Sequence, residues 1–153
     1  MEFRLSIAGD QQIARRFVRF ADNVEDARPV FRNLMGTYRK RSSKQFTSQG
    51  KSGSGGWKPL KPSTVAAKKR AGLDRRILHA TLRLRESMTG SHPSDGIRII
   101  LPGSMAFGST VKYAPYHQHG TKNMPRRRVL ELTEAERRAD LKTIQRFIVT
   151  GRV

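Results

Sequence analysis

Gly96-Ile-Arg-Ile-Ile-Leu101, followed by Pro102-Gly103 and then Met105-Ala-Phe107, is the stretch that decides the fold class. Apolar residues dominate both runs, which is typical of β-strands, and Pro102-Gly103 is a turn signal between them. A further short strand is predicted over residues 110–113, after Gly108. The stretch therefore predicts a small antiparallel sheet, which the flanking segments must cover with helices.

Upstream of the sheet, the sequence predicts one strand and two helices. Phe3, Leu5 and Ile7 alternate with polar residues, which is the period of a half-buried strand over residues 3–8. A helix over 11–22 follows, because apolar residues recur there at helical spacing. Its apolar positions are Ile13, Phe17, Phe20 or Ala21, and Val24. A second helix begins near Pro29, with the apolar stripe Val30 or Phe31, Leu34, Met35 and Tyr38.

Three more helices are predicted, and the whole chain is interpreted as one domain. A short basic helix spans 65–71, and an amphipathic helix over 77–88 ends before Gly90. Thr133 and Glu136 have capping-box spacing, which marks the start of a last helix. Residues 1–153 thus form a single α+β domain in which a small antiparallel sheet packs with amphipathic helices.

A basic Gly/Ser-rich loop is expected to be flexible over about residues 42–60, because residues 48–56 carry no side chains that could build a core. Gly50-Lys51-Ser52 matches the end of a phosphate-binding loop. However, Gln45 stands where that motif requires its first glycine, and no strand precedes the loop, so no nucleotide site is predicted. Trp57 follows directly and has two open interpretations: it docks in a neighbouring copy, or it is a local lid on the core.

The charge balance is the strongest compositional signal. The 153 residues contain 31 Lys+Arg against 12 Asp+Glu, for a formal net charge of +19, and no cysteine. The missing cysteines exclude disulfide scaffolds, Cys-ligated zinc and thiol nucleophiles, and favour a cytosolic origin. No stretch approaches the roughly 18 apolar residues of a membrane span, so no membrane-spanning segment is expected, and no membrane is among the predicted partners. The positive surplus implies a polyanion nearby, and on charge alone nucleic acid, an acidic protein face and an anionic membrane surface are all open.

The basic residues come in blocks, which predict a surface that contacts DNA backbone or another polyanion without reading sequence. The candidate contact residues are Arg39, Lys40, Arg41, Lys44, Lys68, Lys69, Arg70, Arg126, Arg127 and Arg128. Catalysis is not expected. His117 and His119 are the only candidate residues for a metal or hydrolytic site, and no Asp, Glu or Cys lies near them in sequence to complete the set of ligands. No cofactor is predicted.

Three segments together resemble the phage virion-morphogenesis family, the tail-completion proteins of Mu-like and related tailed phages. They are Trp57-Lys-Pro-Leu60 with Thr64 and Lys68-Lys69, the run from Ile77 to Ser87, and Tyr113-Ala-Pro-Tyr-His-Gln-His-Gly120 followed by Met124-Pro-Arg-Arg-Arg-Val-Leu130. The chain departs from the family pattern beside Thr81, where either Leu82 or Arg83 takes the place of the usual glycine. We expect that position to be helical here.

The resemblance implies a non-enzymatic assembly protein that completes the tail or the head–tail junction as a homo-oligomeric ring, possibly a hexamer, around the DNA channel. Its implied partners are itself, neck, tail-terminator or tail-tube proteins, and genomic DNA nearby. Its location would be the virion, and the host cytoplasm during assembly. A non-specific nucleic-acid-binding protein is the alternative.

Residues 113–130 are predicted to contact a neighbouring subunit or partner. Aromatic and imidazole side chains bury well at interfaces, while proline stiffens a segment and glycine permits a turn. The candidate interface residues are Trp57, Tyr113, Tyr116, His117, Gly120 and Pro125. A turn packed on its own sheet is the alternative for this segment.

Overall fold

The protein is described by a computed structural model that covers residues 10–53, 55–90 and 94–153. The strand predicted over 3–8 lies outside these residues. The chain forms α1 (Asp10–Glu25), α2 (Arg28–Thr47), α3 (Pro62–Arg70), α4 (Arg83–Thr89), β1 (Gly96–Leu101), β2 (Ser104–Ser109), α5 (Ala114–His119) and α6 (Glu134–Thr150). This is an α+β fold, as the sequence predicts.

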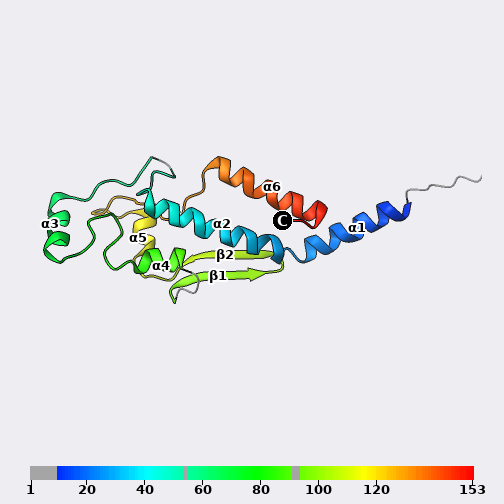
Figure 1. Ribbon diagram of the computed structural model, residues 1–153, viewed down its shortest axis with the longest axis horizontal. Coiled ribbons are helices and arrows are strands. Elements are labelled where there is room, and N and C mark those ends of the chain that lie inside the picture. Colours follow the sequence, from blue (N-terminus) through cyan, green and yellow to red (C-terminus); the bar gives the residue numbers. More distant parts are fainter. Residues whose placement is uncertain (1–9, 54, 91–93) are drawn as a thin grey trace, which may run out of the picture.

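The long helix α2 is the axis of the molecule (Figure 1). The β1–β2 hairpin and α4 lie along one side of it, α6 lies along the other, α3 is at one end, and α1 projects from the other end. The two strands pair antiparallel from Gly96 opposite Ser109 to Leu101 opposite Ser104, with Pro102-Gly103 as the turn. The predicted hairpin is therefore confirmed, with its second strand longer than expected at both ends.

In the described part of the chain, two hydrophobic clusters form the core. The first lies where the C-terminal end of α2 meets α4 and α5, and contains Phe46, Trp57, Leu84, Met88, Val111, Ala114 and Val129. The second lies between α2 and α6, and contains Ala27, Val30, Leu34 and Phe147. The second cluster uses Val30 and Leu34 of the apolar stripe predicted for α2, whereas α2 contributes Phe46, outside that stripe, to the first cluster.

The start of α6 follows from a local rule. The Thr133 side chain accepts from the Glu136 backbone N–H, and the Glu136 carboxylate accepts from the Thr133 N–H. Each side chain therefore satisfies a backbone donor that the first helical turn leaves open. The capping box predicted from the spacing of these two residues is confirmed.

The predicted helix over 77–88 is wrong in its first half. Only Arg83–Thr89 is helical, and Leu78 and Leu82 have positive φ angles of 59° and 58°. The Ile77 N–H donates to the Gln49 side-chain oxygen at 2.7 Å, so a contact with a residue distant in sequence holds the chain at this point. Leu82 takes the left-handed conformation that a glycine favours, so a turn is present there and the expected helix is not.

Two further expectations change. Residues 110–113 form no strand and instead lead into α5, the short helix that carries His117 and His119. Residues 42–47 belong to α2 and not to a loop. Two glutamines hold the irregular segments that follow these helices. Gln45 of α2 accepts from the Ser52 hydroxyl at 2.6 Å, and Gln118 of α5 donates to the Leu130 carbonyl at 2.7 Å.

Candidate interaction groove

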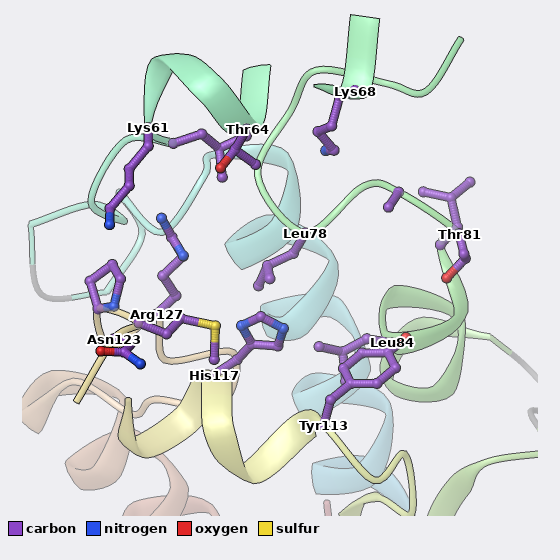
Figure 2. Close-up of a pocket in the computed structure, with 15 residues that line it drawn as sticks. Lys61, Thr64, Lys68, Leu78, Thr81, Leu84, Tyr113, His117, Asn123 and Arg127 are labelled. Atoms are coloured by element: carbon purple, nitrogen blue, oxygen red, sulfur yellow. The ribbon is translucent and has the colours of Figure 1, made fainter. Parts of the chain in front are cut away.

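A groove of about 590 Å³ opens beside α5, and we call it the α5 groove. Three separate segments line it: residues 60–68, residues 78–84, and residues 113–127. Its apolar lining comes mainly from Leu60, Leu78, Leu82, Leu84, Met124 and Pro125. Figure 2 shows His117 and Tyr113 rising from α5 on one side, with Lys61 and Thr64 on the other.

Arg127 joins two of these segments. It is buried, and its guanidinium donates from Nε to the Lys58 carbonyl at 3.0 Å and from Nη2 to the Pro59 carbonyl at 3.2 Å. Its backbone N–H donates to the His117 carbonyl at 2.8 Å. Burial lowers the pKa of Arg127. Arg127 therefore ties the chain before α3 to the loop after α5 and shapes the wall of the groove.

His117 lies half-buried in the groove wall. Its ring meets Tyr113 edge-on with centroids 5.8 Å apart, and its Nδ1 is buried with no hydrogen-bond partner. Burial, and secondarily the charge of Arg127, lower the pKa of His117 below 6.5. The imidazole is therefore neutral at pH 7, and its ring adds mainly surface to the groove.

Gly120 ends α5 for a steric reason. Its φ is +79°, and a Cβ there would lie 2.9 Å from the backbone nitrogen of Arg126. A side chain would push the 121–126 loop away from α5. Gly120 therefore lets the loop that carries Pro125 fold back against the groove.

The structure brings together three of the predicted interface residues. Tyr113, His117 and Pro125 line the α5 groove, whereas Tyr116 is 57% exposed outside it and Gly120 only shapes the loop. Trp57 is 8% exposed and packs edge-on against Phe46 at 5.6 Å. It has the geometry of the local core lid, which was one of its two interpretations.

The predicted polyanion contacts divide into two groups. Exposed side chains belong to Lys40, Lys44, Lys69, Arg70 and Arg126. The others are bonded to groups of the same chain. Arg41 pairs with Asp140 at 2.6 Å and Arg128 pairs with Glu131, while Arg39 donates to the Thr89 carbonyl and Lys68 donates to the Arg76 carbonyl. With Arg127 buried as well, half of this set holds the fold together.

Sequence reasoning missed most of the apolar lining. The sequence predicts Leu78 and Leu82 only as part of the helix over 77–88, and Met124 only as part of a motif. Leu78 and Leu82 have positive φ angles, and a test of apolar periodicity does not detect such a turn. Within the described residues, no three His, Asp or Glu side chains are grouped so that they could hold a metal ion.

The groove is built from the segments that carry the family motifs. The sequence profile of the phage virion morphogenesis family matches residues 8–148 of the chain. The protein belongs to this family. Searches of curated proteins and of solved structures each returned no match. Virion morphogenesis proteins are phage assembly components, so this chain has a structural role in building the virion. In the described part of the chain, every helix falls short of what crossing a bilayer requires.

Proposed function

We propose that this protein completes the phage tail or the head–tail junction as a homo-oligomeric ring around the DNA channel, and that it does so without catalysing a reaction. The observation that carries the proposal is the match of the virion morphogenesis family over 8–148. The α5 groove supports it, because an exposed apolar groove lined by Tyr113, His117 and Pro125 suits a protein partner.

The charge distribution supports a position near DNA. The chain carries a net charge of +19, and Lys40, Lys44, Lys69, Arg70 and Arg126 remain exposed after folding. A lumen lined by such side chains would attract phosphates without sequence preference, over about a Debye length. Neck, tail-terminator or tail-tube proteins would be the other neighbours in the particle.

The test is to disrupt the gene in the phage or prophage that encodes it. The expected result is an accumulation of filled heads and tails that do not join, visible by electron microscopy and corrected by supplying the protein in trans. Normal particles from the disrupted phage would contradict the proposal. Native mass spectrometry of the purified chain measures the ring and the number of its subunits.

The same positive surface favours a second candidate, a non-specific nucleic-acid-binding protein. The two functions predict different behaviour of the isolated monomer. Tight duplex binding that weakens steeply with salt, together with normal particle assembly in the disrupted phage, would favour the second candidate.

A further inference from the structure

Among the residues that the structure describes, the apolar face of α1 is bordered by Val149, Thr150 and Arg152 but is left largely exposed. None of the 16 residues of α1 is buried. Ile13, Phe17, Phe20 and Val24 are between 46% and 70% exposed. Their spacings of four, three and four residues place them on one face of the helix, as in the seam between two packed helices. A projecting helix with such a face needs a partner.

The base of α1 is nevertheless fixed to the body. The Asn23 side-chain amide donates to the Phe147 and Ile148 carbonyls at the end of α6, at 3.2 and 3.0 Å. The Phe147 carbonyl also accepts from the Gly151 N–H that caps α6, and the Ile148 carbonyl is among those that the last turn of a helix leaves open. Asn23 thus sets the direction in which α1 projects, away from the body (Figure 1).

The α5 groove lies at the opposite end of the molecule. The helices α3, α4 and α5 surround it, while α1 extends from the far end of α2 (Figure 1). The helix therefore does not reach the groove of its own chain. Any contact between these two surfaces joins different molecules.

The two surfaces match in size and chemistry. A cavity of about 150 Å³ holds one benzene ring, so a groove of about 590 Å³ has room for two phenyl groups and an aliphatic side chain. Phe17, Phe20 and Ile13 are such a set. The groove meets them with leucine, methionine and proline side chains at Leu60, Leu78, Leu82, Met124 and Pro125.

Charge also favours α1 over other segments of a second copy. Copies with a net charge of +19 repel each other. In α1, however, three arginines are balanced by Asp10, Asp22 and Glu25, so the helix has no net charge. The groove carries Lys61 and Lys68 at its rim. A neutral helix enters it with less repulsion than α2 would, because α2 has six basic residues and no acidic ones.

We propose that the Ile13–Phe17–Phe20–Val24 face of α1 docks in the α5 groove of a second copy of this chain. The contact joins two different surfaces, so its repetition closes into a ring or extends as a filament. This contact would be the subunit interface of the proposed ring, so the inference rests on the proposed function.

The first test compares two neighbouring substitutions on α1. Phe17 is 70% exposed on the apolar face, and Val18 is 61% exposed about a quarter turn away. Phe17→Ser should weaken self-association at least tenfold in sedimentation velocity, while Val18→Ser changes it less than twofold. Circular dichroism of both variants checks that α1 stays helical. Equal association of wild type and Phe17→Ser would overturn the contact but leave the ring standing, whereas a wild type that never associates would overturn both.

The second test uses the absence of cysteine from the chain. Ala14 is exposed on α1 beside the apolar face, Ala80 is exposed in the groove lining, and Ala139 is exposed on α6. A mixture of Ala14→Cys and Ala80→Cys chains treated with a short bismaleimide should give a cross-linked dimer. The Ala14→Cys and Ala139→Cys mixture is the matched control. A dimer of Ala14→Cys with itself, or equal yields in both mixtures, would overturn the proposal in favour of an α1–α1 pair or random encounter.

Discussion

The indole Nε1 of Trp57 donates a 2.8 Å hydrogen bond to the carbonyl oxygen of Arg128. The Gln45 side-chain amide donates to the same oxygen at 3.1 Å. Two residues from either side of the Gly/Ser segment thus hold the chain after α5. The Trp57 ring meanwhile covers Phe46, which is fully buried.

Trp57→Phe should lower the free energy of unfolding by about 1–2 kcal/mol, because a hydrogen bond and part of a buried ring are lost while Gln45 still satisfies the carbonyl. Urea denaturation measures this. In the wild type, the tryptophan emission should be that of a buried indole and should not move when the chain associates. A blue shift on association would instead place Trp57 at a subunit contact.

Leu82 occupies a conformation that costs an L-residue about 1–2 kcal/mol, since its φ is +58°. Leu82→Gly and Leu82→Ala remove the same partly exposed side chain, but only glycine relieves the strain. We expect the glycine variant to be more stable than the alanine variant by about 0.5–1 kcal/mol, after allowing for the greater freedom of glycine in the unfolded chain. Thermal unfolding of the pair measures the difference, and equal stabilities would mean that the turn at Leu82 is not formed.

Asp140 joins α6 to α2 through both of its carboxylate oxygens. They accept from the Arg41 guanidinium at 2.6 and 2.8 Å, and the side chain of Asp140 is only 10% exposed. Asp140→Asn should lower stability by about 2 kcal/mol, because it leaves a partly buried guanidinium with the longer contact to Glu136 and the ring of Tyr38.

The matched control is Glu134→Gln on the same helix. Glu134 pairs with Arg138 at 3.2 Å, but both side chains are largely exposed, so the change should have little effect. Chemical denaturation of both variants gives the comparison. Similar losses from the two substitutions would contradict the interhelical role of Asp140.

His117 should make stability depend on pH. Burial and Arg127 lower its pKa below 6.5 in the folded chain, so between that lower value and 6.5 the unfolded chain binds a proton that the folded chain does not. The stability that comes from keeping His117 neutral in the folded chain is fully present above pH 6.5 and is lost as the pH falls below it. His117→Gln should therefore reduce the loss of stability between about pH 8 and about pH 5. A difference between wild type and variant that stays constant across this range would contradict the effect.

Prediction from sequence succeeded where the deciding partners are close along the chain. The capping box at Thr133 and Glu136 spans three residues, and the β1–β2 hairpin closes through Pro102-Gly103. It failed over 77–82, where the apolar spacing is helical but the Ile77 N–H has its acceptor in Gln49, 28 residues earlier. The residues of the groove were only partly found, since nothing local distinguishes Leu78 or Met124 as a lining residue.

By itself, the sequence determined the α+β class, the charge, the apolar stripe of α1 and the motifs of the virion morphogenesis family, because each depends on composition or on spacing within a few residues. Only the tertiary structure decided that Trp57 and Arg127 turn inward, that the α1 stripe is left exposed by the rest of the described chain, and that three distant segments enclose one groove. The bond from Trp57 to Arg128 spans 71 residues, and contacts at that separation depend on how whole elements pack.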